Sequence, residues 1–186
     1  FVRLQIFTSV LGEKGWGMEV SLPFNSQDYS CMHPSLSADG KTLYFSSDMP
    51  GGAGGIDIWK STWDGANWSA PVNLSNTVNS IGDEVFPSIS DGNVLYYSSN
   101  GLPGLGGLDV YMSELQGSNW STAMNLGADI NSGGDDFGFL MLAAAELHDR
   151  TFAKGLFDLA QGGIERLLLF SSIHFVLPLG GAKCGD

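Results

Sequence analysis

Apolar and polar residues alternate in short runs separated by clusters of Gly, Asp, Asn and Ser, a pattern typical of β-strands joined by tight turns. Asp39-Gly40 and Asp64-Gly65 stand between such runs, and Asp-Gly pairs favour the positive φ angles of hairpin turns. The chain is therefore predicted to be all-β. In the first complete stretch, the expected strands are 34–37, 42–47, 56–62 and 68–74.

The chain also repeats itself with a period of 52 residues. Trp16, Trp68 and Trp120 stand at this spacing. The same offset aligns longer segments, namely 43–48 with 95–100, 54–57 with 106–109, and 79–84 with 131–136. Several matches in one register across two periods indicate a true structural repeat.

A period of this length that holds four antiparallel strands is typical of a β-propeller blade, since the common helical repeats are shorter. We therefore expect a partial β-propeller of four-stranded antiparallel blades over 1–139. It would consist of a partial blade at 1–31, a blade at 32–84 and a blade at 85–137. Propellers close with about four to eight blades, so further sequence or another chain is expected to complete the ring.

The repeat stops near Phe139. The next tryptophan would fall at Ser172, and the segment 140–147 has a helix-forming composition. Residues 140–186 are therefore expected to be an irregular C-terminal segment, either a degenerate blade or a non-homologous tail. A reading-frame change after Phe139 is a further alternative.

Charge and composition restrict the partners. The formal net charge is −12, which disfavours binding to nucleic acids and to anionic membrane surfaces. The longest apolar run, 167–179, is shorter than the roughly 20 residues of a spanning helix, so no transmembrane insertion is expected. Cys31 and Cys184 lie far apart and form no disulfide framework or metal motif.

Acidic residues recur at two places in each copy, after the paired glycines and just before the next copy begins. Repeated carboxylates on one rim would suit weak calcium sites. The alternative, which we favour, is that they accept backbone N–H bonds in turns or lie solvated in loops, because calcium loops offer several closely spaced oxygens. No cofactor is otherwise expected. The weak calcium candidates are Asp57, Asp109, Asp83, Glu84, Asp135 and Asp136.

Other recurring residues are expected to be structural. Trp16, Trp68 and Trp120 would suit an aromatic platform, but their recurrence in every copy favours packing between neighbouring blades. The paired glycines lack the Lys-Ser/Thr of a phosphate-binding loop. His33, His148 and His174 are isolated, and no hydrolase motif is present, so no catalytic residue is assigned. The expected structural glycines are Gly54, Gly55, Gly106 and Gly107.

The stretch from His33 to Asp48, followed by Gly54 to Trp59, resembles the PD40 or WD40-like β-propeller repeat. That pattern is a Pro-x-x-Ser-x-Asp-Gly-Lys strand pair, a Phe-x-Ser segment and a Gly-rich turn that ends in Asp-Ile-Tyr. The chain is similar to envelope proteins of Bacteroidetes-type bacteria that carry such blades beside a peptidoglycan-binding OmpA-like domain. This resemblance implies a periplasmic or outer-membrane-associated scaffold.

The resemblance implies a noncatalytic module that binds protein partners or peptidoglycan-associated envelope components. Two other functions are consistent with such blades. They could belong to a larger hydrolase, either a serine peptidase or a glycosidase, or they could form a polysaccharide-binding module. A hydrolase domain in the same reading frame would favour the first, and glycan binding through an exposed aromatic residue would favour the second.

Overall fold

The computed structural model describes residues 2–140, and in this part of the chain all regular structure is β-strand. The expected C-terminal segment 140–186, with His148, His174 and Cys184, lies outside the described residues except for Leu140. The all-β expectation is confirmed. Every pair of strands runs antiparallel.

The N-terminal segment forms two small hairpin-like sheets. β1 (Phe7–Thr8) pairs with β4 (Val20–Ser21), and β2 (Leu11–Gly12) pairs with β3 (Gly15–Trp16). β2 and β3 lie between β1 and β4 in sequence, so the inner hairpin extends from the outer pair. Gly15 has a φ of 108°, which provides the left-handed residue that the short turn requires.

Two larger sheets follow. The first has the strand order β5-β6-β7-β8, and the second has the order β12-β11-β10-β9 with β13 also paired to β11. The strands of the first sheet are β5 (Cys31–Leu36), β6 (Thr42–Ser47), β7 (Asp57–Thr62) and β8 (Val72–Asn73). Those of the second are β9 (Glu84–Ile89), β10 (Val94–Ser99), β11 (Asp109–Gln116), β12 (Asn119–Trp120) and β13 (Met124–Asn125).

The expected fourth strand, 68–74, is divided in two. Trp68 makes only an isolated bridge to Trp63, and β8 follows after a gap. The gap arises because the Ser69 hydroxyl accepts the Thr62 N–H (3.0 Å), a position at which a regular ladder would place a backbone carbonyl. In the second sheet Ser121 accepts the Glu114 N–H in the same way, between β12 and β13.

The turn between the first two strands differs in length between the two larger sheets. In the first sheet Ser37 N–H donates to Thr42 O, whereas in the second sheet Ser90 N–H donates to Val94 O. The turn in the first sheet is therefore one residue longer. β9 therefore begins 53 residues after β5, although β10 begins 52 residues after β6. Gly40 has positive φ as expected, but in the second turn this role falls to Asn93 (φ 58°) and not to Gly92.

The first strands begin at Cys31 and Glu84, one residue before the expected copy boundaries at 32 and 85. Each first residue is fixed from the preceding unit. Cys31 N–H donates to Leu4 O (2.9 Å), and Glu84 N–H donates to Ile56 O (2.6 Å). These bonds place the starts of β5 and β9 against the preceding copy.

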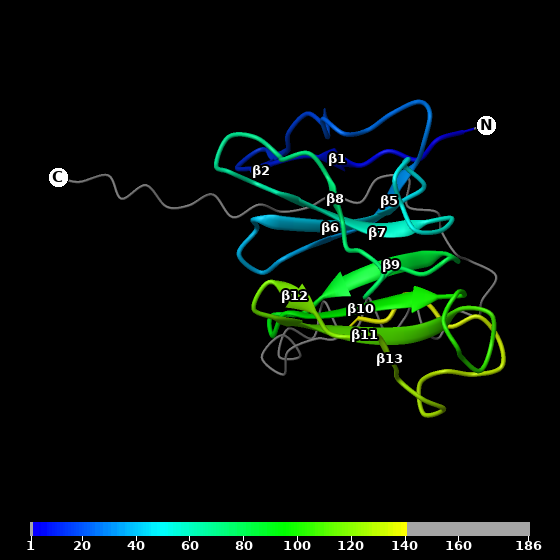
Figure 1. The fold of residues 1–186 in the computed structure, drawn as a ribbon. Helices are drawn as coiled ribbons and strands as arrows, with labels where there is room; N and C mark the ends of the chain where they lie inside the picture. Colours follow the sequence, from blue (N-terminus) through cyan, green and yellow to red (C-terminus); the bar gives the residue numbers. More distant parts are fainter. Residues whose placement is uncertain (1, 141–186) are drawn as a thin grey trace.

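The sheets stack face to face, with the N-terminal strands on one side of the first sheet and the second sheet on the other (Figure 1). Side chains of a strand alternate between its faces. Tyr44 and Ile58 accordingly pack toward the second sheet, whereas Leu43, Phe45 and Trp59 pack toward the N-terminal segment. The first sheet is therefore buried on both faces.

Trp120 anchors the contact between the two larger sheets. It is 9% exposed, and its ring meets the Tyr44 ring edge to face at a centroid distance of 5.9 Å and an angle of 80°. The same cluster includes Leu74, Val78, Leu95, Tyr97 and Tyr111. Within the described residues, no helix has the length and apolar character needed to cross a membrane.

We predict that Trp120→Ala lowers the free energy of unfolding by about 3–5 kcal/mol, because it opens a cavity between the sheets. Trp16→Ala serves as the control, since Trp16 is 46% exposed and should cost much less. Urea unfolding followed by circular dichroism measures both. Equal losses in the two variants would contradict the role given to Trp120.

Candidate functional site

The segment that joins the first sheet to the second is fastened to the start of β7 by a side-chain amide. Ile58 N–H donates to Asn79 Oδ1 (2.8 Å), and Asn79 Nδ2 donates back to Ile58 O (3.1 Å). Both residues are buried. The amide thus satisfies two backbone groups that water cannot reach. The same two-way bond recurs in the pairs Val110–Asn131 and Ile6–Asn25.

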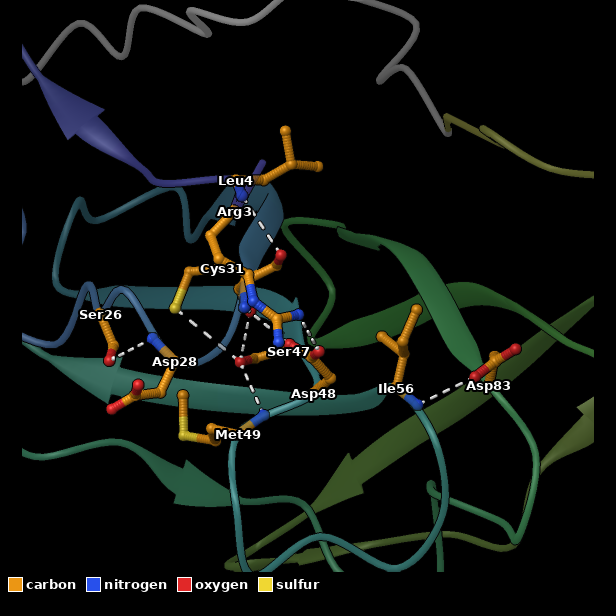
Figure 2. A network of polar contacts seen from close by, with 11 residues as sticks. Arg3, Leu4, Ser26, Asp28, Cys31, Ser47, Asp48, Met49, Ile56 and Asp83 are labelled. Carbon is orange, nitrogen blue, oxygen red and sulfur yellow. Dashed lines mark hydrogen bonds and ion pairs between the residues drawn. The ribbon is translucent and has the colours of Figure 1, made fainter. Parts of the chain in front are cut away.

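Asp83 and Asp135 form a second recurring connection. Ile56 N–H donates to Asp83 Oδ1 at 2.9 Å (Figure 2), and Leu108 N–H donates to Asp135 Oδ1 at 2.9 Å. Asn100, which follows β10, also donates to Asp83 through Nδ2 (3.1 Å). The Asp83 carboxylate therefore joins the loop before β7 to the loop after β10, so it links the two sheets.

Asp57 and Asp109 close the glycine-rich loops that precede β7 and β11. Both are 1% exposed. Asp57 accepts the N–H groups of Ala53 and Gly54, and Asp109 accepts those of Leu105 (2.8 Å) and Gly106 (3.1 Å). Asn73 adds a third bond to Asp57 through Nδ2 (3.0 Å). These carboxylates hold their own loops, which is the arrangement that the structural alternative predicts.

Glu84 is fully buried at the start of β9. It accepts the Ser80 N–H (2.8 Å) and the hydroxyls of Ser80 (2.5 Å) and Ser99 (2.6 Å). Burial raises the pKa of Glu84 above its ordinary value, the serine hydrogen bonds lower it, and the charge of Asp57 raises it further. Asp136 is bonded to the N–H and hydroxyl of Ser132 in the same way.

Cys31 takes the place of Glu84 in the first sheet. It pairs with Ser47 in the register by which Glu84 pairs with Ser99, and its Sγ lies 3.8 Å from Ser47 Oγ (Figure 2). Burial raises the pKa of the thiol to about 11, so Cys31 is a neutral thiol near pH 7.

The paired glycines allow the loops to approach the next sheet closely. A Cβ on Gly54 would lie 2.5 Å from the carbonyl oxygens of Ser80 and Gly82, and one on Gly106 would overlap the Gly134 carbonyl. Side chains at Gly55 and Gly107 would meet the carboxylates of Asp83 and Asp135, respectively. Each glycine-rich loop can lie in contact with the segment that leads to the next copy because these positions carry no side chain.

The six calcium candidates are thus all engaged with protein donors. The described residues contain no group of three or more His, Cys, Asp or Glu side chains that could hold a metal ion. The asparagines of the two-way bond are site residues that the sequence expectations do not include. Their signal was present, because Asn79 and Asn131 lie in one of the aligned segments.

The three tryptophans lie in different surroundings. Trp120 packs between the larger sheets, and half-buried Trp68 packs against the cluster between the first sheet and the N-terminal segment. Trp68 also lies 5.4 Å from Trp63, ring to ring. Trp16 is 46% exposed. Two of the three positions therefore contribute to packing against the preceding unit.

An aromatic column joins β5 and β9 to the segment that follows the second sheet. The His33 ring stacks on Phe86 with centroids 3.8 Å apart and planes 24° apart, and Phe86 stacks on Phe137 at 5.1 Å and 19°. His33 and Phe86 both have positive φ, at 49° and 53°. Both lie at irregularities where the ladder to the second strand shifts register. His33, which is isolated in the sequence pattern, thus has its partner 53 residues away in sequence.

His33 is neutral in this setting. Its Nδ1 accepts the Phe86 N–H at 3.4 Å, and its ring is half-buried. Burial lowers the pKa of His33 to about 4 because the charged imidazolium would lose water. Ser35, two residues further along β5, accepts the Ile89 N–H (3.0 Å). β5 and β9 are therefore joined by side-chain acceptors along their neighbouring edges.

The chain matches no known family model, and no curated protein matches it.

We predict that Gly54→Ala lowers the free energy of unfolding by about 1–3 kcal/mol, because its Cβ meets backbone that cannot move independently. Gly133→Ala is the matched control, since a Cβ there meets nothing within 4 Å. Chemical denaturation compares the two. A Gly54→Ala protein as stable as Gly133→Ala would contradict the close approach.

We predict that stability falls as the pH drops from 6.5 toward 4 in part because of His33. The unfolded chain binds a proton at the ordinary pKa of 6.5, whereas the folded chain does so only near 4. The contribution of His33 to the free energy of unfolding is therefore complete above pH 6.5. Below pH 6.5 it declines by at most about 1.4 kcal/mol per pH unit. Denaturation of His33→Phe at pH 7, 6 and 5 should show a shallower decline. If the free energy of unfolding decreased equally with pH in the unmodified protein and in His33→Phe, this prediction would be wrong.

Proposed function

We propose that the chain is part of a β-propeller that serves as a noncatalytic binding and scaffolding module. The observation that carries this proposal is the face-to-face stacking of two antiparallel sheets joined by recurring side-chain bonds. The same bonds extend beyond the two sheets. Asn25 bonds Ile6 on one side, and Asp136 N–H donates to Leu108 O (2.6 Å) on the other. This continuity supports an array with further blades, as a propeller requires.

We further propose a periplasmic or outer-membrane-associated location, with protein partners or peptidoglycan-associated components as ligands. The support is the resemblance of the repeat to envelope propellers. The net charge of −12 favours protein surfaces over nucleic acids as partners.

A binding function also agrees with how the polar side chains are used. Glu84, Asp57 and Ser99 are buried and bonded within the junction between the sheets. Apolar side chains instead project from neighbouring loops, since Ile81 is 87% exposed and Leu105 is 54% exposed. Exposed apolar residues on loops that a rigid scaffold holds in place are suited to contact a partner.

The test is site-specific crosslinking in the native bacterium. A photoreactive amino acid at Ile81 should crosslink a specific protein that recurs in the envelope fraction and is identified by mass spectrometry. The same group at Met18, which is 90% exposed between β3 and β4, is the matched control. Crosslinks that are equal at both positions would contradict the proposal. So would hydrolysis of peptide or glycoside substrates, or retention on polysaccharide that Trp16→Ala abolishes.

A further inference from the structure

Glu84 connects two loops of the junction between the larger sheets. Its carboxylate accepts the hydroxyl of Ser80 at 2.5 Å and that of Ser99 at 2.6 Å. The Ser80 oxygen in turn accepts the N–H of Gly82 (3.0 Å). The Ser99 oxygen accepts the N–H of Gly101 (3.1 Å). One buried side chain thus holds both loops through a chain of hydrogen bonds.

The loop between Asn79 and Asp83 has anchored ends. Asn79 is bonded to the start of β7, and Asp83 is bonded to the loop before β7. Within the loop, Glu84 accepts the Ser80 N–H (2.8 Å), and one loop carbonyl accepts the Gly55 N–H (2.9 Å). Weaker bonding to Glu84 would therefore loosen this short loop and leave its two anchors in place.

The surroundings of Glu84 disfavour a charged carboxylate. Glu84 is fully buried, and the donors that bond it in the described part of the chain are all neutral. Asp57, which is 1% exposed, adds a second negative charge nearby. Burial raises the pKa of Tyr97, the other titratable group that senses Glu84, so this phenol carries no charge near pH 7. The adjacent Asp83 is bonded elsewhere. Burial without a cation favours the protonated acid.

The first sheet has a neutral group at the same position. Cys31 pairs with Ser47 in the register by which Glu84 pairs with Ser99. Burial raises the pKa of the Cys31 thiol to about 11, so the thiol is neutral. The junction between the first sheet and the N-terminal segment is thus formed around an uncharged side chain. The fold therefore accepts an uncharged side chain where a first strand begins.

We propose that Glu84 is a pH-sensitive switch for the loop that carries Ile81, which is held closed when Glu84 is protonated and loosened when Glu84 is charged. A charged carboxylate is stabilised if the loop opens and admits water, whereas a protonated one gains little. The buried form therefore binds a proton more tightly than the hydrated form, so a fall in pH favours the closed loop. Ile81 is 87% exposed, and this inference rests on the proposed binding function by identifying how its contact is regulated.

Hydrogen exchange of the unmodified full chain, followed by NMR at pH 4.5 and 7.5, tests the switch. After correction for intrinsic exchange rates, the amides of Ser80 and Gly82 should be about threefold or more better protected at pH 4.5. The Ser132 amide is the internal control. It is bonded in the same way to Asp136, which is only half-buried, and it shares any global effect of pH. Protection at Ser80 and Gly82 that is equal at both pH values, or lower at pH 4.5, would overturn the inference.

Two neutral variants separate the charge of Glu84 from its packing. In Glu84→Gln the loop should be equally protected at both pH values, at the level of the unmodified protein at pH 4.5. Glu84→Cys introduces the residue of the first sheet and tests the same point if Glu84→Gln does not fold. Asp91→Asn removes a charge from an exposed turn and should keep the pH dependence. A pH dependence that persists in a folded neutral variant would also overturn the inference.

The two proposals fail separately. A partner that crosslinks at Ile81, together with loop protection that does not depend on pH, would overturn the switch and leave the binding function in place. A pH-dependent loop without any partner at Ile81 would support the switch. It would count against the proposed function.

Discussion

The backbone of Ile58 is fully buried, and both of its polar groups are bonded to the side-chain amide of Asn79. A buried backbone group without a partner costs about 1–3 kcal/mol. The segment that joins the first sheet to the second must therefore stay where Asn79 can reach Ile58. Asn73 reinforces this position by accepting a bond from Asn79 Nδ2 (2.9 Å). The placement of the second sheet over the first, and with it the contact of Trp120 with Tyr44, depends on this connection.

The glycines and acidic residues of the repeat follow from the same constraint. A loop that lies against the segment leading to the next copy has no room for side chains at Gly54 or Gly106. Its exposed N–H groups also need acceptors, and the nearest are the carboxylates of Asp57 and Asp83. An acidic, glycine-rich motif is thus what close contact between neighbouring sheets demands. The recurring carboxylates of the motif meet this demand for acceptors.

Positions that differ between copies are informative in another way. Cys31 and Glu84 begin β5 and β9, and Asp136 makes the equivalent backbone bond to the preceding sheet, so the fold tolerates different side chains there. The left-handed position likewise changes from His33 to Phe86 to Gly138. At such positions the backbone is fixed by neighbouring bonds while the side chain is free to vary.

The sequence by itself determined the all-β class, the second and third strands of the first large sheet and the recurrence of Gly54 and Gly106, because alternation and turn residues act locally. It did not locate the division of 68–74, since this depends on a hydroxyl, that of Ser69, replacing a backbone acceptor. Only the tertiary structure decided the roles of Asp83 and Asn79, because their donors Ile56 and Ile58 lie 27 and 21 residues away in sequence. It also brought His33, Phe86 and Phe137 together, since stacking joins residues from three copies that no local pattern relates.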